Sequence, residues 1–165
     1  MIMKKSQSIL IRKTPEWDEK EVSYTNEVLE FALNSLLICG EKKYEVSVLL
    51  TNDKEIRQLN KKYRNIDKAT NVLSFSIEND AYLNDLKMIG DLVLSKERII
   101  KEAHEQKKPF NEHFAHLLIH GFLHLLDFSH ESQKNSNLME KKEVELLGKL
   151  NIPVEKQELW HFSFR

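Results

Sequence analysis

Residues 114–130 have the sequence FAHLLIHGFLHLLDFSH and decide the fold that we predict for this chain of 165 residues. They contain its longest apolar region, and Pro109 shortly before them separates this region from the preceding helix. Histidines and Asp127 interrupt the apolar run, so it falls short of the ~18 to 20 uninterrupted residues that span a bilayer. We therefore predict a packed helix inside a globular domain and not a membrane span.

Three histidines in this stretch have the spacing of metal ligands. His120 and His124 are one helical turn apart, which places their side chains on one face with Cβ atoms ~6 Å apart. His130 follows after Asp127 and Ser129, which are able to end the helix and turn the chain back. Three protein ligands leave a fourth position open, as in catalytic zinc sites, whereas structural sites normally have four ligands and often use thiolates. The pattern predicts one zinc ion per chain, although imidazoles also bind nickel, copper and iron.

The other histidines admit a plainer interpretation. His113 and His116 fall on nearly the same helical face, so a stripe of hydrogen-bonded polar side chains is the alternative to a metal site. His116 precedes His120 by one turn and is either an orienting group or a packed side chain. For His104 and His161 we expect surface positions.

The same histidine spacing occurs in zinc peptidases, which need a glutamate directly after the first histidine as general base. Here that position holds Gly121. Asp127, Glu131 or another carboxylate brought in by the fold would have to replace the glutamate. A zinc peptidase is therefore our second hypothesis, and Gly121 indicates either close helix packing or space beside the metal.

Outward from this stretch, strand and helix patterns alternate without repeats or low-complexity linkers. Thr14 is the expected cap of a first helix that ends before Gly40, and Asn52 with Glu55 forms a capping box before a second helix. We predict strands at residues 8–12, 44–50, 72–77 and 92–94, a loop at 78–85, and helices at 15–39, 53–63, 95–103 and 137–150 besides the histidine-rich helix.

These elements predict the fold class α/β (mixed α+β). A small mixed sheet should pack against helices, with the metal site on a central helix and the loop that follows it. The length fits one domain over residues 1–165. The tail through Trp160, Phe162 and Phe164 is compatible with either a strand or a docking segment.

The composition limits the partners and the compartment. The chain has 25 basic and 26 acidic residues, so its net charge of −1 gives no global field that attracts nucleic acid, and an RNA substrate needs a local basic patch. The single cysteine, Cys39, cannot form an internal disulfide, which favours a reducing compartment. The apolar stretch at residues 9–11 is too short for a signal-peptide core, and we expect a cytoplasmic protein.

Three segments resemble the bacterial YbeY endoribonucleases in order and spacing: NKKYRNIDKATNVLSF at residues 60–75, GDLV at 90–93, and FAHLLIHGFLHLLDFSH at 114–130. The resemblance implies an α/β fold with one zinc ion, held by motif match by His120, His124 and His130. It also implies that Arg64 is the family's functionally important arginine. The implied activity is that of a single-strand-specific, metal-dependent endoribonuclease in ribosomal RNA maturation and ribosome quality control, with RNA and the ribosome or small-subunit proteins as partners.

The chain departs from the family pattern in two segments. The family usually has Gly-Tyr-Asp at residues 127–129, where this chain has Asp-Phe-Ser, and a proline commonly stands at the position of Ala69. The departures concern the local turn before His130, and Asp127 is the candidate to replace the carboxylate that position 129 lacks.

Arg64 suits phosphodiester chemistry, because a guanidinium offers a fixed pair of donors to phosphoryl oxygens on which negative charge develops. We predict that Arg64 clamps the phosphate. Lys61, Lys62 and Lys68 complete the densest positive cluster near a predicted loop. This cluster is either the local field that RNA requires or an ordinary solvated helix end.

The expected mechanism uses the ion to lower the pKa of a water molecule, while Arg64 stabilises the developing charge. The RNA 2′-hydroxyl is the alternative nucleophile, and no residue pattern fixes a general base. Asp91 either orients a ligand or belongs to a turn that starts at Gly90. A ribosome-associated binding protein with a structural metal is the third hypothesis. No pattern indicates an oligomeric state.

Overall fold

The computed structural model describes residues 7–36, 43–77, 82–83, 86–127 and 132–154. Their sheet has the strand order β1-β2-β5-β3, with β4 paired to β5 beside this path. β1 is parallel to β2 and β2 to β5, whereas β3 and β4 are antiparallel to β5. The strands are β1 Ser8–Lys13, β2 Lys43–Thr51, β3 Val72–Ser76, β4 Tyr82–Leu83 and β5 Leu86–Ser95.

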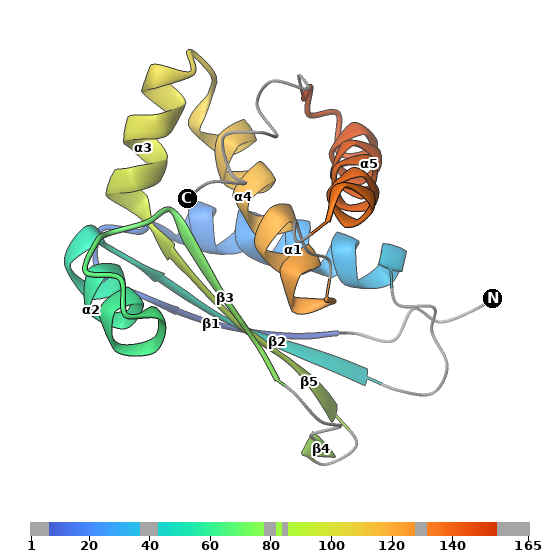
Figure 1. Cartoon of the computed structure of the whole chain (residues 1–165), viewed down its shortest axis with the longest axis horizontal. Helices are drawn as coiled ribbons and strands as arrows, with labels where there is room; N and C mark the ends of the chain where they lie inside the picture. The colour runs from blue at the N-terminus through green and yellow to red at the C-terminus, as the bar shows by residue number, and fades with distance from the viewer. Residues whose placement is uncertain (1–6, 37–42, 78–81, 84–85, 128–131, 155–165) are drawn as a thin grey trace.

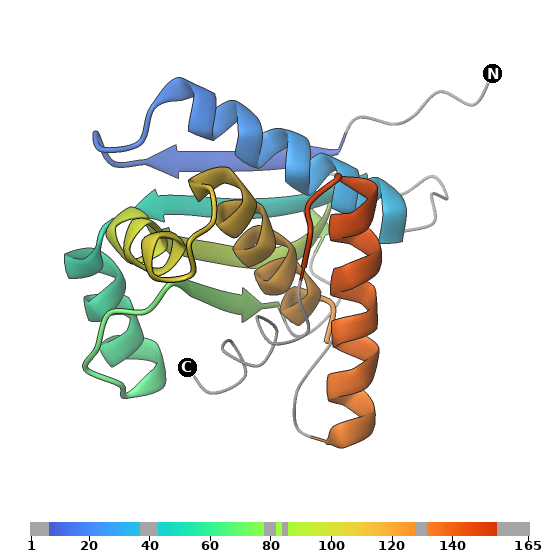
Figure 2. The same cartoon turned by 90° about the horizontal axis from the view of Figure 1, so that it is seen from above.

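Helices pack against this mixed sheet, which confirms the predicted fold class. They are α1 Glu19–Leu36, α2 Asp53–Arg64, α3 Lys96–Glu105, α4 Phe110–Leu125 and α5 Gln133–Lys149. Figure 1 shows α1, α3, α4 and α5 together over one face of the sheet. Figure 2, seen from above, shows α4 between α1, α3 and α5. No helix in the described part of the chain is long and apolar enough to cross a membrane.

The central helix α4 is buried on all sides, as the apolar stretch predicted. Every residue at positions 113–123 is buried, because β3 and β5 lie beneath the helix and α1, α3 and α5 surround it. A helix in this position needs apolar residues all round and has no polar face. His113, His116 and His120 are therefore buried polar groups that require partners.

The strands bury their two faces against different helices. Val46, Val48 and Leu50 of β2 belong to the main core under α4. Leu49 interrupts the alternation of apolar and polar residues in β2, and the structure explains why. Its side chain points to the opposite face of the sheet and packs against the small cluster that Ile56 of α2 forms with strand residues, so α2 covers that face.

The first helix begins later than predicted. α1 starts at Glu19 instead of residue 15, and its cap is Asp18 instead of Thr14. Asp18 accepts the main-chain N–H of Glu21 at 2.8 Å while its own N–H donates to the Glu21 carboxylate at 2.8 Å, a reciprocal capping box. The reason is tertiary: Trp17 is 1% exposed, and its indole N–H donates to the Thr51 carbonyl. The predicted end of this helix lies at residues 37–42, outside the described residues.

Strand β5 is longer than predicted. It begins at Leu86 instead of residue 92 and passes through Gly90 and Asp91, while β4 lies inside the predicted loop. The pairing of β2 with β5 shifts its register between Glu45 and Val46, opposite Gly90, whose φ is 155°. A Cβ atom on Gly90 would lie 2.3 Å from the Phe75 carbonyl oxygen, so only glycine fits this bulge.

The remaining elements differ only at their ends. α2 begins after Asn52, whose side chain accepts the Glu55 N–H at 3.0 Å, which confirms the predicted cap. α5 begins at Gln133 instead of residue 137, because the Ser132 side chain accepts the N–H of Asn135 and caps a polar first turn. The C-terminal tail is outside the described residues.

Candidate active site

Helix α4 places His120 and His124 so that one ion can reach both. Their Nε2 atoms are 3.2 Å apart, and the ring planes are nearly perpendicular at 82°. Two nitrogens at ~2.05 Å from a tetrahedral zinc ion are about 3.3 Å apart, so this pair fits the ion. His130 lies in the segment 128–131, outside the described residues, and among the residues that the structure does describe no group of three potential ligands is found. The three-histidine set thus stays a prediction, with two members in suitable positions.

Glu143 of α5 fixes the orientation of His120. Its Oε1 atom lies 2.6 Å from Nδ1 of His120, and its Oε2 atom lies 3.1 Å from Nε2 of His116. A carboxylate only accepts hydrogen bonds, so both imidazole nitrogens donate to it. With its proton on Nδ1, His120 turns the lone pair of Nε2 toward His124. This is the arrangement in which a carboxylate orients a metal-binding histidine.

The pKa values of Glu143 and His116 agree with a charged carboxylate and a neutral imidazole. Burial alone would raise the pKa of Glu143, but hydrogen bonds from His116 and His120 outweigh burial and lower this pKa to about 2. Burial lowers the pKa of His116, more than Glu143 raises it. The charge in this part of the protein interior therefore belongs to Glu143.

Helix α4 ends directly after His124, and the chain turns there. Its C-cap is Leu126, and the following Asp127 has a φ of 67°, in the left-handed region. Glycine adopts this conformation most easily, and aspartate tolerates it. The turn at position 127 therefore does not require glycine. The main-chain N–H of Asp127 donates to the His124 carbonyl at 3.2 Å. The structure thus gives Asp127 a role in the turn.

His113 has a separate partner. Its Nε2 atom is 2.7 Å from Oε2 of Glu102 in α3, and the side chain of Asn71 donates to the same carboxylate. All three residues are buried. This network ties α3 and α4 to the start of β3. The stripe of hydrogen-bonded histidines is therefore correct for His113, whereas His116 shares the carboxylate that orients His120. His104 is exposed, as expected, and His161 lies outside the described residues.

Gly121 provides the contact between α4 and the sheet. A Cβ atom there would lie 2.9 Å from Leu92 Cδ2 and 3.0 Å from Val72 Cγ2. The hydroxyl of Ser74 in β3 donates to the Gly121 carbonyl at 3.0 Å. Close packing is thus the reason for glycine here, and the glutamate of the zinc peptidases has no space at this position.

Arg64 is connected to the histidine helix through the same strand. Its Nη2 atom donates to the main-chain carbonyl of Ser74 at 2.7 Å, and its guanidinium lies 5.4 Å from the ring centre of Phe75. Since Ser74 also bonds Gly121, which directly follows His120, two consecutive contacts link the arginine to the α4 site. The remaining donors of this exposed guanidinium are oriented by both contacts.

The predicted basic cluster divides into two parts. Lys61 approaches Asp67 at 3.6 Å, on the side of α2 that faces the following loop. Lys62 lies instead over the ring of Tyr63, which is 57% exposed. Lysines that are adjacent in sequence thus face different surroundings.

Asp91 is not brought to the histidines. It lies within β5 and not in a turn, in register with Ser47 and Phe75. Its neighbour Leu92 belongs to the core under α4, so the alternation of the strand points Asp91 to the other face. Burial raises the pKa of Asp91, and a hydrogen bond with Ser47 partly opposes this effect.

Sequence reasoning missed Glu143, Glu102 and Ser74. Each acts across elements that are distant in the chain, and none belongs to a motif with a fixed offset from its partner. The only signal was indirect: buried histidines on one helix, here His113, His116 and His120, require acceptors from the neighbouring elements.

The sequence is similar to known proteins over most of its length. A family model described as endoribonuclease YbeY matches residues 9–151. The endoribonuclease YbeY of Neorickettsia sennetsu is 43% identical over 138 residues, which cover 84% of this chain and 93% of the relative. That of Bartonella bacilliformis is 39% identical over 139 residues, or 83% of this chain and 88% of the relative.

A solved structure shares the fold. The solution structure of a Thermotoga maritima protein superposes with a TM-score of 0.56 at 26% identity, and the match covers 87% of this chain and 91% of that one. The family model and the two relatives each cover well over half of the chain. This chain belongs to the endoribonuclease YbeY family.

Proposed function

We propose that this chain is a single-strand-specific, zinc-dependent endoribonuclease that hydrolyses RNA phosphodiesters in ribosomal RNA maturation and ribosome quality control. His120, His124 and His130 are the proposed ligands of one zinc ion, and Arg64 is the proposed phosphate clamp. Membership of the endoribonuclease YbeY family supports the RNA-cleaving activity. The observation that carries the metal site is the pair of Nε2 atoms 3.2 Å apart, with Glu143 behind one of them.

The residues divide the chemistry between them. A zinc ion, when bound, supplies a Lewis acid and activates water. Glu143 keeps the proton of His120 on Nδ1, so that Nε2 is available as a ligand. Arg64, held by Ser74, places its remaining N–H donors where a phosphate can accept them, and these donors stabilise the negative charge that develops during cleavage.

The nucleophile is either a water molecule or the RNA 2′-hydroxyl. The two alternatives leave different product ends: direct hydrolysis gives a linear phosphate, and attack by the 2′-hydroxyl gives a cyclic one. Analysis of the product termini by mass spectrometry separates them.

A zinc peptidase is the weaker hypothesis, because Gly121 packs against Leu92 and Val72 where the peptidase glutamate would stand. A ribosome-associated binding protein with a structural metal predicts RNA or ribosome binding without cleavage. We further propose the cytoplasm as its location and ribosomal RNA, with the ribosome or small-subunit proteins, as its partners. The single-domain organisation over residues 1–165 stays a prediction.

The decisive experiment compares cleavage of a defined single-stranded RNA by zinc-loaded wild type, Arg64→Ala and His124→Ala. We expect kcat to fall by about 10² to 10³ in Arg64→Ala with zinc retained, because one donor to a developing charge is typically worth this factor. His124→Ala should lose both zinc and cleavage.

Arg12→Ala is the matched control, because Arg12 is an exposed arginine on β1, whereas β3 lies at the other end of the strand order. It should cleave like the wild type. Equal cleavage by all four proteins would contradict the proposal and identify the activity as a contaminating nuclease.

A further inference from the structure

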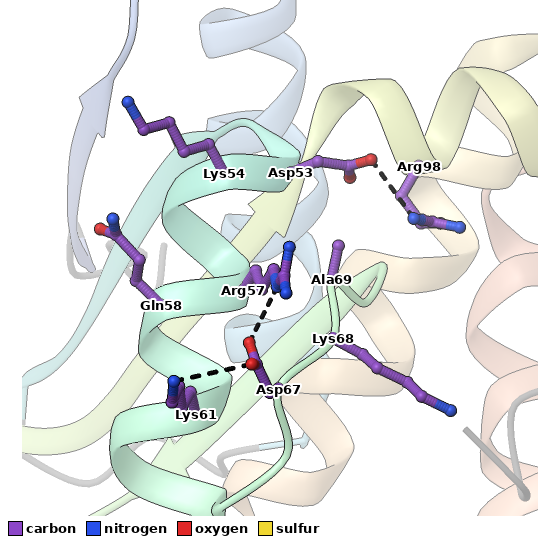
Figure 3. Close-up of a pocket in the computed structure, with 9 residues that line it drawn as sticks. All are labelled: Asp53, Lys54, Arg57, Gln58, Lys61, Asp67, Lys68, Ala69 and Arg98. Carbon is purple, nitrogen blue, oxygen red and sulfur yellow. Dashed lines mark hydrogen bonds and ion pairs between the residues drawn. The ribbon is translucent and has the colours of Figure 1, made fainter.

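A groove runs along α2, on the side of that helix that faces the loop at residues 65–71 and helix α3. Its lining is mainly basic, as Figure 3 shows, and the basic side chains are Lys54, Arg57, Lys61, Lys68 and Arg98. Two acidic side chains also line it, so the cations are in excess although the whole chain has a net charge of −1. We call this surface the α2 groove.

The two aspartates of the α2 groove hold some of the cations in place. Asp67 accepts a hydrogen bond from Nε of Arg57 at 2.8 Å and lies 3.6 Å from Nζ of Lys61. Asp53 pairs with Arg98 at 3.3 Å (Figure 3). Exposed ion pairs contribute little to stability, so these contacts matter mainly because they order donors that would otherwise sample many rotamers. An Arg57 bound through Nε keeps its terminal N–H groups for another acceptor.

The α2 groove is aligned with the proposed active site. Arg57, Lys61 and Arg64 stand at positions i, i+4 and i+7 of one helix and therefore share one face. The axial rise from the first to the third is about 10 Å, since each residue adds ~1.5 Å. A line of cations on α2 thus leads to the arginine that contacts Ser74.

We propose that the α2 groove binds the sugar-phosphate backbone of the RNA strand beyond the scissile phosphate, so that Arg57, Lys61 and Lys68 position the substrate that Arg64 clamps. Spaced cations on one face match a chain of phosphates, which supplies most of the affinity in nucleic-acid binding. The proposal rests on the proposed function, because it requires the RNA strand to continue from the α2 groove toward the histidines of α4. It concerns only how the strand is held, and no residue of the groove takes part in the chemistry.

The test measures RNA binding and RNA cleavage separately. Binding of a 20-nucleotide single-stranded RNA is followed by fluorescence anisotropy in EDTA, at several salt concentrations, for wild type and two double variants. Arg57→Gln/Lys61→Gln removes the two cations of α2 that contact Asp67. Lys54→Ala/Lys68→Ala removes cations that form no ion pair with any of the described residues, so it tests the groove without releasing Asp67. Lys20→Ala/Lys141→Ala is the control, because it removes the same charge from exposed positions on α1 and α5.

Each groove variant should bind the RNA about tenfold more weakly and lower the salt slope by about 1.4, while the control does neither. Cleavage of a dinucleotide, whose single phosphate is the scissile one and leaves none for the groove, should be unchanged in kcat. Binding by both groove variants that equals the control would overturn the proposal. So would an RNA affinity that is unchanged while binding of polyglutamate is lost, because the groove would then serve an acidic protein segment.

The two proposals fail differently. If the wild type binds RNA through the groove but cleaves no RNA, the nuclease is wrong and the groove stands. If it cleaves the dinucleotide and the 20-mer with equal KM, the nuclease stands and the groove is wrong.

Discussion

At the scale of single residues, Glu143 decides what His120 is able to do. A buried imidazole is free to carry its proton on either nitrogen, and only one tautomer presents Nε2 to an ion. The carboxylate on Nδ1 selects that tautomer at 2.6 Å. Its other oxygen is satisfied by His116, so the charge is fully bonded in the interior.

Replacement of Glu143 by glutamine should reduce zinc affinity by about 10- to 100-fold, the usual effect of removing a carboxylate that orients a metal-binding histidine. Competition with a chromophoric chelator measures this affinity directly, without any nuclease assay. Circular dichroism at 222 nm reports whether the variant is folded.

Glu102→Gln is the matched control. Glu102 is 2% exposed, close to the 1% of Glu143, and it also bonds a histidine of α4, but that histidine is His113 and not a proposed ligand. The control should lose stability and keep its zinc affinity. If both variants lose affinity equally, general loosening of α4 is the cause and the orienting role of Glu143 is wrong.

At the scale of elements, local rules predicted helix α2 well and the start of α1 poorly. The cap at Asn52 and the apolar spacing after it are contained in a few consecutive residues, so the sequence shows them. The start of α1 depends on Trp17, whose indole N–H bonds Thr51 on a strand 34 residues away. The burial of Trp17 thus outweighs the local preference of Pro15 for the first position of a helix. The predicted strand at residues 92–94 was shorter than β5 for a similar reason. Gly90 is typical of a turn in the sequence, and its place in a bulge depends on the neighbouring strands.

The close contact of α4 with the sheet predicts opposite effects on stability when alanine replaces glycine in two different helices. Gly121→Ala should lower the free energy of unfolding by about 1–3 kcal/mol, because the added Cβ would lie 2.9 Å from Leu92 and 3.0 Å from Val72. Gly148→Ala should raise it by about 0.5–1 kcal/mol, since α5 has open space there and alanine favours the helix. Urea unfolding of both variants measures the difference. A similar change in both would mean that α4 is able to move away from β3 without cost.

At the scale of the whole molecule, the site is assembled from separated parts of the chain. The spacing of His120 and His124 follows from helix geometry alone and was predictable. Their relation to Arg64 passes through Ser74, and the support of His120 comes from α5, so both depend on how the helices pack. The motif resemblance predicted Arg64 as a site residue, but it did not predict the contacts that Arg64 makes. Helical spacing alone does not indicate which carboxylate meets which histidine.

The stability of the metal-free protein should fall on acidification in a manner that Glu143 controls. Its pKa is lowered from 4.5 to about 2 in the folded state, so its contribution is complete above pH 4.5 and is lost as the pH falls toward 2. The amount is on the order of 3 kcal/mol, at 1.36 kcal/mol for each pH unit. His116 acts in the same direction at higher pH, because the unfolded chain takes up a proton below pH 6.5 that the buried imidazole refuses.

Urea unfolding in EDTA between pH 7 and pH 3 measures this dependence. Glu143→Gln should be less stable at pH 7 and should lose less stability than the wild type below pH 4.5. Parallel curves for the two proteins would show that other carboxylates carry the acid sensitivity.

The position of Glu143 on the last described helix also sets the order in which the enzyme matures during synthesis. The imidazoles of His120 and His124 leave the ribosome before the carboxylate that must lie behind one of them. A nascent chain that ends between these residues has the metal-binding spacing but not the partner that selects the tautomer. The proposed metal site is therefore completed only after α5 has been translated and has packed against α4, so an unfinished polypeptide does not yet hold His120 in the orientation that the proposed ligand needs.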